Sequence, residues 1–331
     1  MWALNRLASP LHQSLGESRF PLTHRTFATK RRFVTQPNAP QGRIGRLPPW
    51  LKKSAGDYQA IHALKSHLRA RRLTTVCEEA RCPNIGECFS RGTATFMICG
   101  EVCTRACRFC AVQHGRGAPL DPDEPRHVAE QVAAMGLHHV VVTSVARDDL
   151  PDEGAAHFAA TIHAIRAATP STTIEVLVPD FHDRTDCLQI VGVAAPDIFN
   201  HNLETVRRLT PQIRSKARYD RSLAVLQHFK TLFPQTMTKS GLMVGLGESP
   251  TEMEQALRDL RDVGCDVVTI GQYLQPTAQH YPVAEFVPPA QFAQYQQFGA
   301  ALGFRHVFSG PFVRSSYMAE SQWIRAKTRE E

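Results

Sequence analysis

The sequence predicts an α/β fold in which parallel strands form a partial (β/α)6 barrel of the TIM type. Six short β-rich segments alternate with longer helical segments, and repeated strand–helix units give a parallel sheet. The strands carry few charges, as expected when both faces of a sheet are covered. No G-x-G-x-x-G motif follows the first strand, which disfavours a dinucleotide-binding fold.

Each element is assigned from its residue pattern. The expected strands are Ala94–Ile98, His139–Thr143, Thr173–Val178, Ile198–His201, Thr238–Val244 and Val267–Ile270. The expected helices lie over or near Tyr58–Leu73, Pro125–Met135, Gly154–Ala168, Asp186–Val193, Asp220–Leu232 and Thr251–Val263. In the first helix Ile61, Leu64 and Leu68 fall near one face, which is the spacing of an amphipathic helix.

The charge is concentrated at the start of the 331-residue chain, whose net charge is +7. Residues 1–53 hold ten Lys and Arg and one acid, so they carry +9 and the remainder carries −2. A nearly neutral body is not a nucleic-acid surface, and no apolar run approaches the ~18–20 residues of a membrane helix. Neither nucleic acid nor a membrane is therefore expected as a partner.

The N-terminal arm, residues 1–50, is rich in Arg, Ser, Thr and Pro and has no sustained periodicity. This composition is typical of a disordered extension, and then the protein is expected to be cytoplasmic. An Arg-rich, acid-poor start is also typical of a transit peptide to the mitochondrial or plastid matrix. A third alternative is that translation starts downstream of Met1.

The cysteines are the strongest chemical signal. There are nine, and seven of them lie between Cys77 and Cys110. The segment Cys103–Cys110, called here the cysteine loop, has the spacing C-x3-C-x2-C immediately after the first expected strand. Three thiolates on one tight loop each hold a different iron of a cubane cluster and leave one iron open. A structural zinc site normally has four ligands from paired motifs, so it fits poorly.

A second set, called here the upstream trio, consists of Cys77, Cys82 and Cys88 with the spacing C-x4-C-x5-C. Taken by itself this spacing is equally compatible with a cluster and with zinc or buried thiols. Its position beside the cysteine loop favours a second iron–sulfur cluster. The remaining cysteines are interpreted as buried thiols: Cys99, Cys187 and Cys265.

The cysteine loop resembles that of the radical S-adenosylmethionine superfamily, and the upstream trio narrows the resemblance to the lipoyl synthase family. Further stretches that carry the resemblance are Thr143–Leu150, Val176–Phe181, Phe199–Val206, Lys239–Glu248, Gly271–Thr277 and Gly310–Tyr317. The match covers about residues 50–320. It implies an N-terminal extension at 51–93, a radical barrel at 94–310 and a C-terminal segment at 311–331.

The resemblance implies insertion of two sulfur atoms, at carbons 6 and 8 of an octanoyl group carried on a lysine of a lipoyl carrier domain. Cys103, Cys107 and Cys110 are then expected to hold the 4Fe–4S cluster that cleaves S-adenosylmethionine. The upstream trio is expected to hold an auxiliary 4Fe–4S cluster that supplies sulfur. The family's fourth auxiliary ligand, a serine, maps onto Ser316, in the C-terminal extension.

The expected partners follow from the same resemblance. They are octanoylated carrier domains (2-oxoacid dehydrogenase E2 subunits and the glycine cleavage H protein), a small flavodoxin- or ferredoxin-type electron donor, and an iron–sulfur carrier. Ligands of parallel α/β barrels sit at the carboxyl ends of the strands. The residues expected to bind S-adenosylmethionine are Phe109, Thr143, Ser144, Glu175, Asn200, Arg214 and Lys239. For Arg214 two interpretations stay open. It pairs with the cofactor carboxylate, or it is a plain surface residue.

Two positions depart from the family pattern. Asp152-Glu153-Gly154 stands where the family usually has Asp-Gly-Gly, and Met318 stands where a basic residue is common. Two rival functions remain open. One is another radical sulfur-inserting enzyme, such as a biotin-synthase-like protein. The other is a zinc-stabilised RNA-binding protein, which the neutral body and the lack of interleaved aromatics disfavour.

Overall fold

The computed structural model describes residues 46–53, 56–71, 73–214 and 216–327. These belong to one compact unit that spans Ile44–Glu331. Most of the expected N-terminal arm lies outside the described residues. Within the described ranges no helix combines the length and the apolar character needed to cross a bilayer.

One eight-stranded sheet forms the centre of this unit, with the strands side by side in chain order. The strands are β1 (Thr74–Thr75), β2 (Thr95–Ile98), β3 (His139–Ser144), β4 (Thr173–Leu177), β5 (Ile198–Asn200), β6 (Met237–Val244), β7 (Val267–Gln272) and β8 (His306–Ser309). Strands β2 to β8 are parallel, and β1 pairs antiparallel with β2. No ladder joins β8 to β1 or β2 in the described part of the chain, so the barrel is partial.

The six expected strands are confirmed as β2 to β7, while β1 and β8 are absent from the prediction. Strand β1 has only two residues, too few for any periodicity. Strand β8 is a short segment, His306–Ser309, with one fully buried position, so its sequence carries little strand pattern. The sheet therefore has one parallel strand more than the expected (β/α)6 unit.

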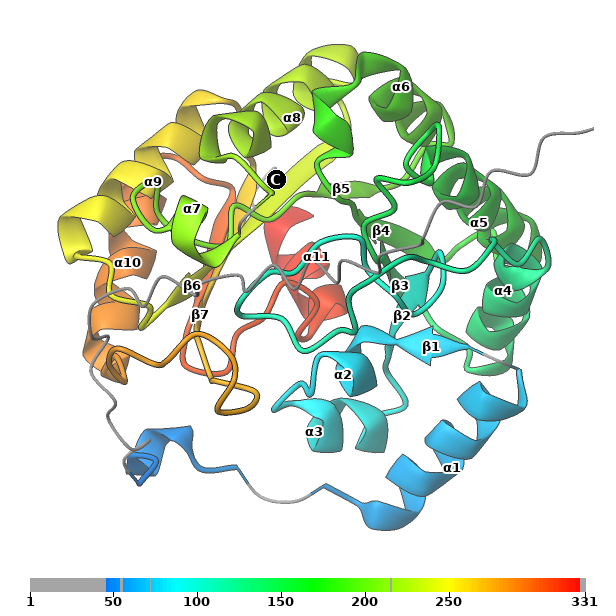
Figure 1. Ribbon diagram of the computed structural model, residues 1–331, viewed down its shortest axis with the longest axis horizontal. Coiled ribbons are helices and arrows are strands. Elements are labelled where there is room, and N and C mark those ends of the chain that lie inside the picture. The colour runs from blue at the N-terminus through cyan, green and yellow to red at the C-terminus, as the bar shows by residue number, and fades with distance from the viewer. Residues whose placement is uncertain (1–45, 54–55, 72, 215, 328–331) are drawn as a thin grey trace, which may run out of the picture. The chain divides into compact units, whose positions relative to one another are not determined.

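Helices cover the outside of the sheet, as Figure 1 shows for α4, α5, α6, α8, α9 and α10. The helices are α1 (Tyr58–Ala70), α2 (Val76–Glu79), α3 (Ile85–Ser90), α4 (Glu124–Ala134), α5 (Ala155–Ala168), α6 (Thr185–Val193), α7 (Thr210–Ile213), α8 (Tyr219–Leu232), α9 (Pro250–Asp262), α10 (Pro289–Ala301) and α11 (Ala319–Lys327). The six expected helices are confirmed within a few residues. The short α2, α3 and α7 and the C-terminal α10 and α11 are absent from the prediction.

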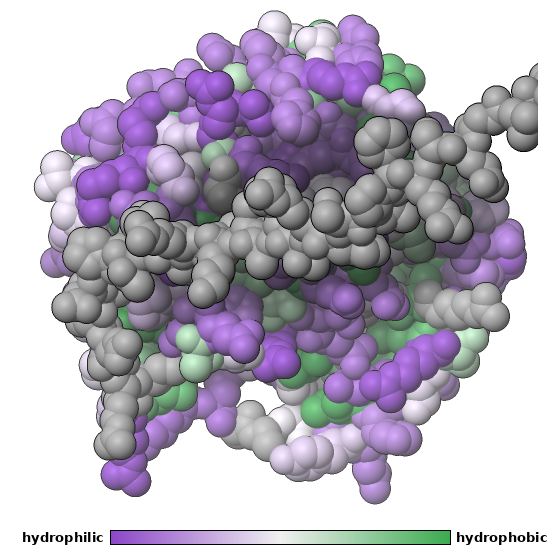
Figure 2. Space-filling model, in the orientation of Figure 1, coloured by the Kyte–Doolittle hydropathy of each residue, from purple (hydrophilic) through white to green (hydrophobic). Residues whose placement is uncertain are grey.

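Local sequence explains why these elements begin where they do. Helix α9 starts with a capping box in which Ser249 accepts from the N–H of Glu252 and the Glu252 carboxylate accepts from the N–H of Ser249. Strand β2 is buried at all four positions, as expected for a parallel strand covered on both faces. Over α8 and α9 the visible face is mainly hydrophilic (Figure 2), so these helices turn their apolar sides to the sheet.

Helix α11 packs against the amino ends of three central strands. Ala326 forms a small apolar cluster with Ile198, Met237 and Val267, which are the first residues of β5, β6 and β7. Helix α11 therefore covers the amino end of the barrel beneath β5–β7. Helix α11 also packs against β3 and β8.

Candidate active site

Backbone hydrogen bonds fix the cysteine loop to the carboxyl ends of the strands. The loop follows β2, and the N–H of Thr104 donates to the carbonyl of Ala146, just after β3 (2.9 Å). The N–H of Arg108 donates to the carbonyl of Ile213, at the end of α7 (2.8 Å). These bonds hold the loop where parallel barrels bind their ligands.

The sulfur atoms of the loop form a buried donor set. The Sγ of Cys103 accepts from the backbone N–H groups of Arg105 (3.4 Å) and Ala146 (3.3 Å). Burial, and then the neighbouring Cys107 and Cys103 thiolates, raise the pKa of Cys110 to about 12. A bound metal deprotonates such thiols outright. Three adjacent thiolates, with N–H donors to one sulfur, fit an iron–sulfur cluster.

Arg105, inside the cysteine loop, ties the loop to two strand ends. Its Nε donates to Oδ1 of Asp148 after β3 (2.9 Å), and its Nη2 donates to Oδ1 of Asp180 after β4 (2.6 Å). Burial by itself would raise the pKa of Asp180, but Arg105 outweighs burial and holds that pKa well below its usual range. The loop is thus locked by a charge-assisted network that needs no metal.

The upstream trio lies beside the amino end of β2. Cys77 is on α2, whose N-cap Thr75 accepts from the N–H of Glu78, and Cys88 is on α3. The N–H and hydroxyl of Thr93 both donate to the carbonyl of Cys88 (2.9 and 3.0 Å), directly before β2. Burial, and then the Cys82 charge, raise the pKa of Cys77 to about 12 and that of Cys88 to about 11.

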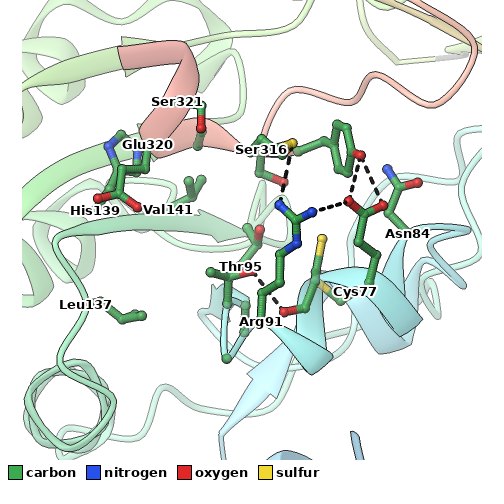
Figure 3. Close-up of a pocket in the computed structure, with 18 of the residues that line it drawn as sticks. Cys77, Asn84, Arg91, Thr95, Leu137, His139, Val141, Ser316, Glu320 and Ser321 are labelled. Carbon is green, nitrogen blue, oxygen red and sulfur yellow. Dashed lines mark hydrogen bonds and ion pairs between the residues drawn. The ribbon is translucent and has the colours of Figure 1, made fainter. Parts of the chain in front are cut away.

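Ser316 lies on the wall of the same cavity as the upstream trio. The cavity measures about 380 Å³, and its lining includes Cys77, Cys82, Cys88 and Ser316. Figure 3 shows Cys77 and Arg91 on one side of it and Ser316 above them. Ser316 belongs to residues 310–318, called here the C-terminal strap, which follow β8 and lead into α11. Three thiols and one hydroxyl from opposite ends of the sequence thus border one space.

Direct contacts join the N-terminal extension to the strap. The Nδ2 of Asn84 donates to the carbonyl of Phe312 (2.7 Å), and the hydroxyl of Tyr317 donates to the Glu87 carboxylate (3.0 Å). The Nζ of Lys53 donates to Glu87 (2.6 Å) and lies 4.7 and 4.8 Å from the ring centres of Phe312 and Tyr317. These contacts, rather than chain proximity, place Ser316 beside the cysteines.

The strap also runs close to the inner side of the sheet. The Nζ of Lys239 on β6 donates to the carbonyl of Ser315 (2.6 Å). A Cβ atom on Gly271 of β7 would lie 1.9 Å from the carbonyl oxygen of Val313, so only glycine leaves room for the strap there. The strap therefore occupies space that side chains of β7 would otherwise fill.

The structure brings three of the predicted cofactor-binding residues into one network. The Nζ of Lys239 and the Nδ2 of Asn200 both donate to Oε1 of Glu175 (2.9 Å each), and the Nε2 of His139 lies 3.5 Å from the same carboxylate. Burial would raise the pKa of Glu175, but Lys239 and His139 outweigh it and hold the pKa at about 2. Through the hydrogen bond from Lys239 to the Ser315 carbonyl, this network anchors the strap.

The other predicted cofactor residues lie nearer the cysteine loop. Thr143 and Ser144 end β3, where the Thr143 hydroxyl donates to the carbonyl of Leu177 (2.9 Å). The Ser144 hydroxyl is buried and has no hydrogen-bond partner in the described part of the chain. Phe109 packs its ring against the main core and is half-buried. Ser144 is therefore the one of these three with free hydrogen-bonding capacity.

Arg214 is buried, so its interpretation as a plain surface residue is wrong. Its Nη1 donates to the carbonyls of Asn202 and Leu203 (3.1 Å each) and to the hydroxyl of Ser222 (3.3 Å). Its Nε is buried without a hydrogen-bond partner among the described residues. The Arg214 charge also lowers the pKa of Cys107, which burial raises. Arg214 thus lies near the cysteine loop with one donor unused.

Three further polar side chains at the site are missing from the predicted set. Burial raises the pKa of Glu204. The charges of Cys82 and Glu204 both raise the pKa of Arg314, which burial lowers. Arg314 is therefore near enough to both Cys82 and Glu204 to interact with their charges. Glu204 and Arg314 belong to motifs that carry the family resemblance, so they were within reach of sequence reasoning. His139 belongs to no such motif.

The comparisons with known proteins agree with this geometry. Residues 97–270 match the radical SAM superfamily, and residues 25–82 match the N-terminal domain of lipoyl synthase of the same family. Lipoyl synthase from Thioalkalivibrio sulfidiphilus is 54% identical over 86% of this chain and 89% of its own length. Lipoyl synthase from Bacteroides thetaiotaomicron is 54% identical over 83% of this chain and 97% of its own length.

Among solved structures, HydG, a hydrogenase maturase, has a TM-score of 0.50 at 14% identity and covers 84% of this chain and 61% of that one. This likeness concerns the fold. The lipoyl synthases are more than half identical to this chain, which covers most of their length. They show the family to which the chain belongs. With a thiol loop at the carboxyl end of a partial barrel and a second thiol set closed by the strap, the chain belongs to the lipoyl synthase family of radical S-adenosylmethionine enzymes.

Proposed function

We propose that this enzyme inserts two sulfur atoms, at carbons 6 and 8, into an octanoyl group bound to a lysine of a lipoyl carrier domain. The observation that supports it best is the joint lining of one cavity by the upstream trio and Ser316. A plain radical barrel needs only the cysteine loop. The second donor set, joined to the barrel by the strap, is what a sulfur-inserting enzyme requires in addition.

Membership of the superfamily implies one 4Fe–4S cluster and S-adenosylmethionine, and we assign the cluster to Cys103, Cys107 and Cys110. When bound, these cofactors supply a carbon-centred radical strong enough to remove hydrogen from an unactivated methylene group, which no side-chain acid or base achieves. The protein itself contributes the positioning of the reacting groups. Arg105, clamped by Asp148 and Asp180, keeps the loop rigid, and its buried surroundings exclude water.

We assign Cys77, Cys82, Cys88 and Ser316 to an auxiliary 4Fe–4S cluster. The donor set is three soft sulfurs and one hard oxygen, and an oxygen ligand matches a sulfide cluster less well than a thiolate. Ser316 is therefore the ligand expected to leave when the cluster gives up sulfur. Arg314, beside Cys82, offers a positive charge to a site that becomes more anionic as thiolates gather.

For S-adenosylmethionine itself we assign contacts to Ser144, Thr143, Phe109 and Arg214, which lie around the carboxyl end of β3 and the cysteine loop. The unused donors of Ser144 and Arg214 suit its amino acid moiety. Glu175, Asn200 and Lys239 stay in the proposed contact set, although their observed partners are each other and the strap.

Family membership implies an octanoylated carrier as substrate. We propose that E2 subunits of 2-oxoacid dehydrogenases and the glycine cleavage H protein serve as carriers. We further propose a flavodoxin- or ferredoxin-type electron donor, and an iron–sulfur carrier that restores the auxiliary site.

The test uses anaerobically prepared protein with reconstituted clusters, S-adenosylmethionine, a strong reductant and an octanoyl-lysine peptide. Mass spectrometry of the peptide should show a gain of two sulfurs and a loss of two hydrogens. Formation of 5′-deoxyadenosine with an unchanged peptide would keep the radical assignment and overturn the substrate.

A further inference from the structure

Three side chains that belong to neither set of cluster cysteines meet beside the carboxyl ends of β3 and β4. Asp148 follows β3, Glu153 lies in the turn before α5, and His182 lies in the short 3-10 helix η2 (Phe181–Asp183), which follows β4. Each residue offers one ligand atom, and these three atoms all lie within 4.8 Å of one another. Two carboxylates and an imidazole from three separate segments therefore converge on one point.

The carboxylate of Glu153 is buried and only partly satisfied. The residue is 5% exposed, and its Oε1 lies 2.8 Å from the Nδ1 of His182. Its other oxygen, Oε2, is buried and has no hydrogen-bond partner in the described part of the chain. A buried carboxylate oxygen is unfavourable unless a donor or a cation satisfies it. The unsatisfied oxygen therefore points to a ligand at this place.

The donor set selects among cations. Mg²⁺ and Ca²⁺ are bound by oxygen ligands, whereas an imidazole nitrogen suits Zn²⁺ and the neighbouring first-row transition metals. The side chain of His182 is 41% exposed, so water completes the ligand shell from that side. The site is thus open to an ion in solution, while Glu153 supplies a buried wall.

The neighbouring positive charges set how tightly a cation is held. The Nε of Arg105 donates to both oxygens of Asp148 (2.9 and 3.1 Å), but Arg105 also donates to Asp180 (2.6 Å), which shares its charge. A carboxylate has about four lone-pair sites, so Asp148 keeps acceptor capacity. The Nζ of Lys216 lies 3.7 Å from Oδ2 of Asp148, and its side chain is 54% exposed. Lys216 is therefore a competitor that turns into water when an ion binds.

We propose that Asp148, Glu153 and His182 bind one divalent transition metal ion of the zinc class, separately from both proposed clusters. Glu153 is the residue that makes the site particular to this chain, since it stands where the family usually has glycine. Because Asp148 also accepts from Arg105, an ion held there fixes the segment to which the cysteine loop is tied. The inference stands independently of the proposed sulfur insertion.

The first experiment measures binding of radioactive Zn²⁺ by anaerobic equilibrium dialysis. It uses full-length protein with reconstituted clusters, so that the cluster cysteines are occupied. Glu153→Gly and His182→Asn should each weaken zinc binding at least about tenfold, since each removes one ligand. Both substitutions suit the backbone, because φ is 52° at Glu153 and 48° at His182, and glycine and asparagine tolerate this left-handed region. Equal iron content in each variant checks that folding is intact.

Two further variants sharpen the result. His228 of α8 is 48% exposed and pairs with Asp183 at 2.9 Å, as His182 pairs with Glu153, but it lies outside the three-residue set. The matched control His228→Asn should therefore keep zinc affinity within about twofold of wild type. Lys216→Ala removes the competing charge and should tighten zinc binding a fewfold.

The second experiment identifies the donor atoms by X-ray absorption at the zinc edge. The expected shell contains only nitrogen and oxygen at about 2.0–2.2 Å, without sulfur at about 2.3 Å. Sulfur ligation, unchanged affinity in Glu153→Gly and His182→Asn, or an equal loss in His228→Asn would overturn the site. Zinc bound by nitrogen and oxygen in protein that fails to take up its clusters would uphold this site and speak only against the proposed clusters.

Discussion

The cysteine loop and the upstream trio are built in opposite ways. The loop gathers three sulfurs within eight residues, and neighbouring strand ends fix it. The proposed auxiliary site adds Ser316 of the strap to the upstream trio, and the contacts that bring the strap there join residues 228 and 230 positions apart. The first site follows from local sequence, whereas the second exists only when the two ends of the described unit have met.

This difference predicts that replacing one cysteine of the loop abolishes S-adenosylmethionine cleavage and leaves the upstream trio intact. Cys103→Ala should reduce 5′-deoxyadenosine formation at least about 1,000-fold, equivalent to ~4 kcal/mol of activation free energy. Iron bound at the upstream trio should be unaffected, since Cys103 is not among the described residues that line the cavity of the trio. Liquid chromatography with mass detection measures the nucleoside. Cys187→Ala, which removes a buried thiol on α6, is the control and should retain turnover.

The strap predicts a split phenotype for Ser316→Ala. Sulfur insertion should fall about 10- to 100-fold because one auxiliary ligand is lost, while S-adenosylmethionine cleavage stays within about twofold. The matched control is Ser315→Ala. The Ser315 hydroxyl donates to Asn202 (2.8 Å), so its loss should cost about 1 kcal/mol of stability and keep insertion. Unaltered lipoyl formation in Ser316→Ala would reject the ligand role.

The anchor of the strap predicts a pH dependence of stability. Lys239 and His139 hold the pKa of Glu175 at about 2, below its ordinary value of 4.5. The lowered pKa contributes up to about 3 kcal/mol above pH ~4.5, and this contribution is lost as the pH falls from there toward ~2. Denaturant unfolding of cluster-free protein should therefore show that Glu175→Gln is destabilised at neutral pH and that its deficit shrinks in acid. Glu130→Gln, in an exposed ion pair, should change little. A constant Glu175→Gln deficit across this range would contradict the assignment.

The smallest expected effect concerns the hydrogen bond from Tyr317 of the strap to Glu87 of the N-terminal extension. Tyr317→Phe removes the hydrogen bond to Glu87 (3.0 Å) and should cost about 1 kcal/mol, as for a half-buried hydrogen bond. Iron at the upstream trio should then be lost a fewfold faster to a chelator, while iron at the cysteine loop is lost at the wild-type rate. Tyr58→Phe on α1, where the residue is largely exposed, is the control. Equally faster iron loss at both sites would mean that the Tyr317–Glu87 hydrogen bond stabilises the whole fold.

Sequence reasoning succeeded where the information is local. Periodicity located β2–β7 and the long outer helices, because burial on both faces leaves a continuous apolar pattern. It missed β1, which has two residues, and α11, whose position beneath β5–β7 depends on Ala326 meeting strands far away in the chain. The ligand spacing pointed to the cysteine loop for the same local reason. The anchoring of Glu175 and Lys239 on the strap had no local signal, since it depends on a backbone carbonyl.

The missing side chain at Gly271 has a consequence for how the protein is made. The strap occupies that space, and its residues leave the ribosome long after the cysteine loop and the upstream trio. Domains fold as their residues emerge, so the cysteine loop is complete long before the strap becomes available. The upstream trio stays without its proposed serine ligand until the strap has emerged. The order of translation therefore separates a site whose residues emerge together from one that is complete only after the distant strap has emerged.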